Sequence, residues 1–488
     1  MPFAETLWGN LVSDLPLLVP VLFLWVVGTL MLWPLGSWLL KAMPKRQWSG
    51  ITFVVLLITL VLVIKTPMAS GFSGMFKVDG LTQGFQILSV VAAAITVILS
   101  QPQLNALQEQ SVEYYALILF STSGMMLLVG ATDLVSLYMA LELMALCIYI
   151  LVGYLREQDR GIEAGVKYFL LGAFSSGLLV YGMSLIFAAA GGTTTNLAAL
   201  NQALALAPHN SELMVFTGVL LVLAGFGFKV AAVPFHMWSP DAYEGAPTPI
   251  TAFMSMAPKA AALGAFVRLF GTGFSGVHGD WAAPLSFMAG ASMIVGNIAA
   301  LRQQSMKRLL AYSSIAHVGY MLLGVLSHDS QAGAQAIWLY MLTYLLMQSG
   351  VFAVIIYLQG KGEGERIEDF RGLSKRRPVL AFAMLVFMLS LGGIPPLVGF
   401  FSKFYLFKLA IEQGFVTLTV LALLTSAISA YYYLNVVATM YFKEAPEGES
   451  QPLGSGLGIV VFATCLLVLV GTCLGPWLMD WTARIVLV

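Results

Sequence analysis

Charge is scarce in this sequence. Only 10% of its 488 residues are Asp, Glu, Lys or Arg, whereas hydrophobic residues make up 59%. A soluble domain carries about 25% charged residues, so this chain could not cover a water-facing surface with its own side chains. The formal net charge is zero. A balanced charge argues against nucleic acid as a partner.

Cysteine and the usual cofactor motifs are lacking too. Cys147, Cys465 and Cys473 occur singly, without a CxxC pair, so the sequence offers no disulfide framework and no ligand set for zinc or an iron–sulfur cluster. No GxGxxG follows a predicted strand, so we expect this chain to bind neither NADH nor flavin. The N-terminus has no basic region, cleavage site or lipidation glycine, and we expect the chain to span its membrane.

What the chain does have is a series of long apolar runs. All but one are about long enough to cross the ~30 Å hydrocarbon core of a bilayer, and the pattern predicts an all-α polytopic membrane protein with about fourteen transmembrane helices. The longest polar connections are 191–212 and 359–378, so no soluble domain is inserted. The predicted spans are 15–40, 50–64 (the shortest), 81–99, 114–131, 133–153, 165–190, 213–235, 248–270, 281–300, 306–326, 334–358, 379–411, 415–441 and 455–478.

The distribution of Lys and Arg predicts the orientation. Counted from an outside N-terminus, sixteen of the 24 basic residues fall in cytoplasmic loops and three outside, namely Lys65, Lys77 and Arg484. Short cytoplasmic loops are enriched in Lys and Arg, and a miscounted helix would scramble every later loop. We therefore predict that both termini face outward.

A weak internal repeat appears when the chain is shifted by 174 or 175 residues. The pattern G-F-x-x-K ends at Lys229 and again at Lys403, Tyr138 meets Tyr312, and Glu142 meets His317. The shift carries the fifth predicted helix onto the tenth, so the repeating unit has five helices. An odd number of helices turns the second copy upside down, which is an architecture typical of secondary transporters.

Ionisable residues lie inside several predicted helices. Glu142, Lys259 and His317 are central in their apolar segments. Lys229 lies nearer the cytoplasmic end of its segment, and Lys403 follows a Gly-Gly-Ile-Pro-Pro break. A charge near the bilayer centre costs ~2.5–3.5 kcal/mol on insertion scales, and such residues mark ion or proton pathways. A shared function explains these five buried ionisable residues better than chance placement does.

Simpler interpretations remain for individual residues. Lys408 and Arg268 lie near predicted helix ends, and we expect both to extend to the membrane interface. The same alternative applies to Lys229. His317 could be an ordinary polar residue that is hydrogen-bonded between helices.

Prolines adjoin three of these lysines. Pro234 follows Lys229, Pro258 directly precedes Lys259, and a Pro395–Pro396 pair precedes Lys403. Proline opens a helix about a turn earlier, and a break inside a membrane persists only where protein or water satisfies the freed backbone groups. We expect helix breaks and hydrated pockets beside these lysines. Desolvation lowers the pKa of an amine and raises that of a carboxyl, so a lysine–glutamate pair that forms and opens can hold and release a proton.

Four stretches resemble a known family. GIEAGVKYFLLGAFSSG, GFGFKVAAVPFHMWSPDAYEGAPTPITAFMSMAPKAA, RQQSMKRLLAYSSIAHVGYMLLG and GGIPPLVGFFSKFYLF are similar to the N subunits of bacterial respiratory NADH:quinone oxidoreductase (complex I). These subunits are similar in turn to mitochondrial subunit 2 and to one half of multisubunit sodium/proton antiporters. The resemblance covers about 115–410.

The resemblance implies an architecture and a role for each site residue. It implies two inverted repeats, helices 4–8 and helices 9–13, in which helices 7 and 12 are discontinuous. Helices 1–3 would then occupy residues 1–112, the two repeats 113–270 and 281–441, and helix 14 with the C-terminus 455–488. Glu142 would pair with Lys229, and Lys259, His317 and Lys403 would continue a proton path. Lower-ranked matches to polar positions of the family are Lys167 and His236.

The resemblance also implies partners, cofactors and location. The chain would be a multi-pass protein of the bacterial inner membrane with both termini periplasmic, and it would translocate protons beside other antiporter-like and small hydrophobic subunits. NADH, FMN, iron–sulfur clusters and quinone would belong to partner subunits. Two alternatives remain at this stage, namely a subunit of a cation/proton antiporter complex and a non-conducting membrane scaffold.

Overall fold

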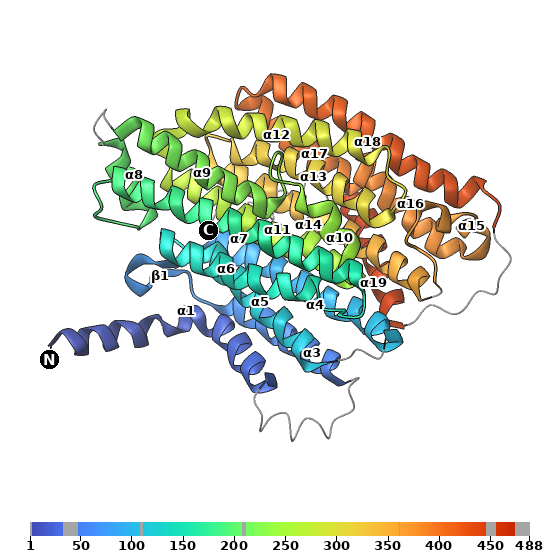
Figure 1. The fold of residues 1–488 in the computed structure, drawn as a ribbon, viewed down its shortest axis with the longest axis horizontal. Coiled ribbons are helices and arrows are strands. Elements are labelled where there is room, and N and C mark those ends of the chain that lie inside the picture. The colour runs from blue at the N-terminus through green and yellow to red at the C-terminus, as the bar shows by residue number, and fades with distance from the viewer. Residues whose placement is uncertain are drawn as a thin grey trace.

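The structure is a computed structural model that describes residues 2–32, 47–107, 111–206, 211–360, 362–445 and 455–473. In Figure 1 the described helices run side by side, from α1 and α3 at one edge to α12 and α18 at the other. The strands among these residues, β1 (Ala69–Gly71) and β2 (Phe76–Val78), form one antiparallel hairpin in which Ser70 lies opposite Lys77.

Each of the fourteen predicted spans coincides with one helix or with two short ones. The first half contains α1 (Pro2–Leu32), α3 (Gln47–Lys65), α4 (Gly80–Leu107), α5 (Val112–Gly130), α6 (Leu134–Val152), α7 (Asp159–Ala189), α8 (Leu197–Ala205), α9 (Glu212–Val230), α10 (Trp238–Gly245) and α11 (Thr248–Arg268). The second half contains α12 (His278–Ala300), α13 (Met306–Val325), α14 (Ser330–Gln359), α15 (Leu373–Arg376), α16 (Pro378–Gly392), α17 (Val398–Glu412), α18 (Val416–Phe442) and α19 (Ser455–Cys473).

The helices have the length and composition of membrane spans. Among the described residues, eleven are long and apolar enough to cross a bilayer, and Pro378–Gly392 and Gly456–Gly471 are shorter apolar helices. The predicted second span, 50–64, belongs to a 19-residue helix and is therefore long enough. The predicted ends at 33–40 and 474–478, and both chain termini, lie outside the described residues.

Two helices are interrupted where prolines predicted a break. The chain leaves α9 at Ala231, which has a left-handed φ of 63°, and resumes at Trp238 in α10. It leaves α16 at Gly393, with φ 76°, and resumes at Val398 in α17. These are the discontinuous helices 7 and 12 of the prediction.

The break expected beside Pro258 is wrong. Helix α11 continues through Pro258 from Thr248 to Arg268, and every one of its residues is buried. Neighbouring helices enclose α11 on all sides, and such packing lets a membrane helix absorb a proline without unwinding.

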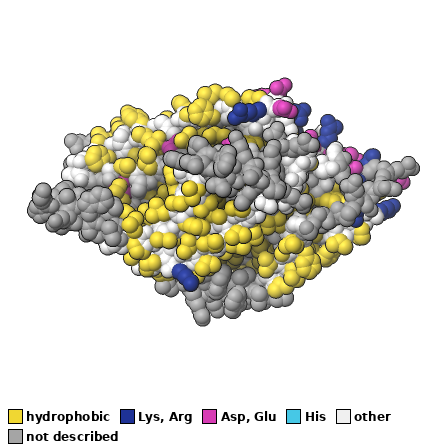
Figure 2. Space-filling view, turned by 90° about the horizontal axis from the view of Figure 1, so that it is seen from below, with side chains coloured by type: hydrophobic (Ala, Val, Ile, Leu, Met, Phe, Trp, Pro, Cys, Tyr) yellow, Lys and Arg dark blue, Asp and Glu magenta, His cyan; other side chains and the backbone are white. Residues whose placement is uncertain are grey.

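The described part of one face of the molecule is largely apolar (Figure 2). In Figure 2 hydrophobic side chains predominate, and charged side chains gather towards the end of the bundle where α15 lies. Large apolar residues such as Leu170 and Phe174 on α7 are more than half exposed. A surface of this kind faces lipid or other membrane helices.

Candidate proton-path residues

Lys229 and Glu142 form a buried ion pair. Lys229 lies in the last turn of α9, and its side chain is only 2% exposed, so it does not extend to the interface. Its ammonium lies 3.3 Å from Glu142 Oε1 on α6 and donates to the hydroxyls of Tyr149, at 3.2 Å, and Ser176, at 3.4 Å. The three donors of the ammonium therefore have three acceptors.

Ser176 joins the two charges. Its hydroxyl donates to Glu142 Oε1 at 2.5 Å while accepting from Lys229. The glutamate side chain is 20% exposed, whereas the lysine is enclosed. An opposite charge with this hydrogen bonding is what a desolvated ammonium requires.

Lys259 is buried without a carboxylate partner. It lies in the middle of α11 and is 1% exposed. Its ammonium donates to Ser314 on α13 and lies 5.5 Å from the centre of the Tyr243 ring. No acidic side chain of the described residues pairs with it. A hydroxyl and a ring face compensate a positive charge less fully than a carboxylate does.

His317 lies one turn further along α13 than Ser314 and is 2% exposed. Its Nδ1 is 2.7 Å from the Tyr340 hydroxyl, and its Nε2 is 3.2 Å from that of Tyr433. The Tyr433 hydroxyl is also 2.7 Å from Ser313. Each ring nitrogen therefore has a partner, which fits both the path and the alternative of an ordinary interhelical histidine.

Lys403 points back at the broken end of the preceding helix. Its ammonium donates to the carbonyl oxygens of Leu391, at 3.0 Å, and Gly392, at 3.2 Å, and to Ser426, at 3.0 Å. The carbonyls at a helix C-terminus carry partial negative charge, which favours a cation there. Gly393 is required beside it, because an added Cβ would lie 2.8 Å from the Lys403 side chain and the φ is positive.

The lower-ranked candidates lie away from these contacts. Lys167 is 47% exposed and pairs with Glu163 and Asp241 at 2.6 and 3.2 Å. His236 is half-buried in the turn between α9 and α10. Within the described part of the chain, neither residue makes a hydrogen bond to Lys229 or Lys259.

Tyrosine rings beside the lysines were not predicted. The ring centres of Tyr149, Tyr243 and Tyr320 lie 5.7, 5.5 and 5.3 Å from the ammonium groups of Lys229, Lys259 and Lys403. Each ring comes from a different helix than its lysine, so sequence spacing could not reveal the pairing. Aromatic faces stabilise desolvated cations.

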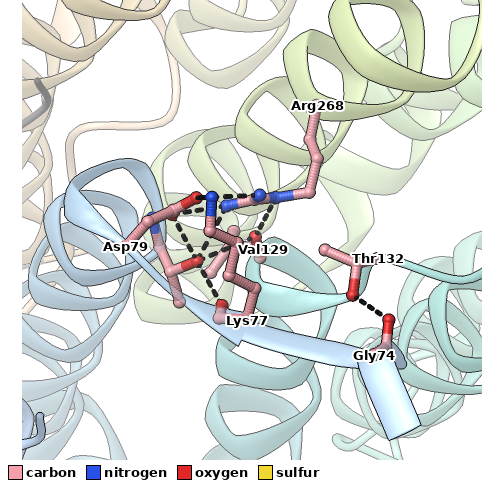
Figure 3. A network of polar contacts seen from close by, with 7 residues as sticks. Gly74, Lys77, Asp79, Val129, Thr132 and Arg268 are labelled. Carbon is pink, nitrogen blue, oxygen red and sulfur yellow. Dashed lines mark hydrogen bonds and ion pairs between the residues drawn. The ribbon is translucent and has the colours of Figure 1, made fainter. Parts of the chain in front are cut away.

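At the end of α11, Arg268 is held inside the protein by a carboxylate. Arg268 is 6% exposed and makes a two-pronged ion pair with Asp79, at 2.6 and 3.0 Å, while donating to the Val129 carbonyl and the Thr82 hydroxyl. Figure 3 shows this network beside the β1–β2 hairpin, where Thr132 also bonds Gly74. Lys408, by contrast, is 55% exposed and pairs with Glu412.

The ionisation of Asp79 follows from these contacts. Burial alone would raise the pKa of its carboxyl. The charge of Arg268 and the hydrogen bonds from Arg268 and Thr82 outweigh burial and hold the pKa well below its ordinary value. The pair therefore remains charged at any working pH and fixes the end of α11 to the start of α4.

Comparison with known proteins identifies the family. Residues 131–429 match a family model described as NADH:quinone oxidoreductase/Mrp antiporter, TM. The chain is 41% identical over 467 residues to NADH-quinone oxidoreductase subunit N of Paramagnetospirillum magneticum, with 94% of each protein covered. It is 46% identical over 379 residues to the same subunit of Trichlorobacter lovleyi, covering 78% of this chain and 77% of that protein. The chain belongs to the family of NADH-quinone oxidoreductase N subunits.

A solved structure agrees with this assignment. The fold matches a chain of respiratory complex I from Thermus thermophilus with bound Aureothin at a TM-score of 0.80 and 33% identity, covering 95% of this chain and 99% of that one. The predicted resemblance to N subunits and the antiporter-like all-α membrane fold are both confirmed. Among the described residues, no group of three or more His, Cys, Asp or Glu side chains could hold a metal ion.

Proposed function

We propose that this chain is a proton-translocating membrane subunit of a respiratory NADH:quinone oxidoreductase. The observation that carries the proposal is a succession of buried ionisable side chains on helices from both halves of the bundle, each held by polar or aromatic partners. The proposed path residues are Glu142, Lys229, Lys259, His317 and Lys403.

The Lys229–Glu142 pair supplies a switch. While the pair is closed, the carboxylate supports the charged lysine; when it opens, the low dielectric favours the neutral amine, and a proton leaves for the next site. Lys259 and Lys403 have no carboxylate partner among the described residues, so their charge depends on hydroxyls, carbonyls and rings. Lys167 and His236 have lesser, peripheral roles in this proposal.

The proposal places the redox chemistry in other chains. NADH, FMN, iron–sulfur clusters and quinone are bound by partner subunits, and this chain adjoins further antiporter-like and small hydrophobic membrane subunits. It lies in the bacterial inner membrane with both termini periplasmic and the α15 end cytoplasmic. The repeats occupy 113–270 and 281–441, preceded by helices 1–3 in 1–112 and followed by helix 14 and the C-terminus in 455–488.

Purification and flux measurements test this function. A respiratory subunit copurifies with flavin- and iron–sulfur-bearing partners, whereas an antiporter subunit does not. NADH oxidation in vesicles should drive proton flux that falls in the Lys259→Ala variant at equal assembly. Unchanged flux would favour a scaffold whose charges only hold helices together.

A further inference from the structure

A cavity of about 800 Å³ opens at the end of the bundle where α15 lies. It lies between the end of α4, the α10–α11 connection, the start of α13 and the end of α14. More than half of the residues that line it are polar or charged, so it can hold water. Lining residues include Gln103, Gly245, Gln303, Lys307, Gln359 and Arg366.

Lys307 forms part of the cavity wall and fixes α10 there. It is buried, and its ammonium donates to the carbonyl oxygens of Glu244, at 3.2 Å, and Ala246, at 2.8 Å. Arg308 pairs with Asp241 at 2.8 Å and with Glu244 at 3.0 Å. These contacts hold the short helix α10 against α13, with its last residues at the cavity.

Two buried hydroxyls lie on α10 just beyond this wall. Ser239 and Tyr243 are four residues apart, so they share one face of the helix, and both are 0% exposed. The Tyr243 hydroxyl interacts with the hydroxyls of Ser239 on its own helix and Ser314 on α13, so three buried hydroxyls lie together. Buried hydroxyls are satisfied by one another or by bound water.

The Tyr243 ring and the Ser314 hydroxyl adjoin Lys259. Ser314, which interacts with the Tyr243 hydroxyl, accepts the hydrogen bond from Lys259. Ser314 follows Lys307 by seven residues on α13, which is roughly 10 Å along the helix axis. Two or three hydroxyls and waters are enough to cover that distance.

We propose that Ser239, Tyr243 and Ser314 form the relay by which Lys259 takes up protons from this cavity. This inference rests on the proposed function, since it names the uptake route of one path residue. Each hydroxyl releases its own proton to the next oxygen and accepts one from the preceding water. The net change is one proton moved from cavity water to the neutral amine of Lys259, with no redox partner involved.

The test compares single-atom deletions in the assembled complex. Tyr243→Phe and Ser239→Ala each remove one oxygen and retain the packing, including the ring beside Lys259. Tyr114→Phe is the matched control, because it removes a buried hydroxyl that bonds Ser100 and not a member of the proposed relay. Proton flux per assembled complex is measured in everted vesicles, in water and in heavy water.

We expect roughly a 100-fold loss of flux in Tyr243→Phe, the lower end of what a positioned proton donor contributes, with a larger solvent isotope effect and normal assembly. Ser239→Ala should also lower the proton flux and raise the solvent isotope effect. If the tyrosine variant assembles poorly, the serine variant provides the test. Normal flux in either assembled variant, or an equal loss in Tyr114→Phe, overturns the relay. Flux in Lys259→Ala decides the proposed function separately: if that variant pumps normally, the function fails as well.

Discussion

Lys403 donates a hydrogen bond to the carbonyl oxygen of Leu391, 3.0 Å away at the open end of α16. Its counterpart by sequence repeat, Lys229, instead lies 3.3 Å from the carboxylate of Glu142. A cation at a helix C-terminus gains at most about 2 kcal/mol, whereas the effective cost of burying an isolated charge is several kcal/mol. The charged form of Lys229 is therefore stabilised more strongly than that of Lys403. Such a difference is suited to two lysines at opposite ends of one proton path.

The Lys229–Glu142 pair should be needed for pumping rather than for assembly. Glu142→Gln keeps shape and hydrogen bonding but removes the charge that supports Lys229, and Lys229→Ala removes the cation. We expect both variants to assemble and to pump poorly, as measured by proton flux per assembled complex. Ser89→Ala, which removes a buried hydroxyl bonded only to its own helix at Phe85, is the control. Full pumping by either stable variant would be inconsistent with the switch.

Orientation can be checked by labelling. Lys375 is exposed on α15, in the connection 359–378 that the basic residues assign to the cytoplasm. In Lys375→Cys, an impermeant thiol reagent should fail to label intact cells and should label everted vesicles. Labelling in intact cells would show that the helix count or the orientation is wrong.

The Asp79–Arg268 pair should contribute to stability. Asp79→Asn leaves the Arg268 charge buried beside a neutral amide, and loss of one partner of a buried pair costs about 3–5 kcal/mol. We expect a lower melting temperature of the assembled subunit, while Asp79→Asn with Arg268→Met should recover part of the loss. Equal melting temperatures for wild type and Asp79→Asn would contradict this role.

The same pair makes a definite pH prediction. Because the pKa of Asp79 is lowered in the folded protein, its contribution is fully present above the ordinary value of 3.8 and is lost as the pH falls below it. Between pH 6 and pH 8, the difference in melting temperature between wild type and Asp79→Asn should stay constant. A difference that varies across this range would assign the effect to another group.

Much of the fold could be predicted because the length of an apolar run can be read directly from the local sequence. The fourteen spans and the breaks after Lys229 and before Lys403 follow from composition and from Pro234 and Pro395. The sequence could not show that α11 passes unbroken through Pro258, since enclosure by neighbouring helices decides that. It also did not show that Arg268 pairs with Asp79, which lies 189 residues away.

The site was predictable in part. Burial of Lys259 follows from its central place in an apolar segment, whatever its partners. That Lys229 pairs with Glu142 was implied by family resemblance, and the structure places the two in contact. The tyrosine rings at the lysines depend on how helices face each other, and periodicity does not encode that.

Proton flux in Lys403 variants tests the central claim most directly, namely that the buried lysines carry protons rather than only charge. Lys403→Arg keeps the positive charge but, with a pKa above ~12, cannot release a proton at working pH. Lys403→Met keeps the length without the charge. Flux per assembled complex is measured in vesicles at matched expression. The account predicts that both variants assemble, retain some electron transfer and lose coupled pumping. Normal flux in the arginine variant would contradict it.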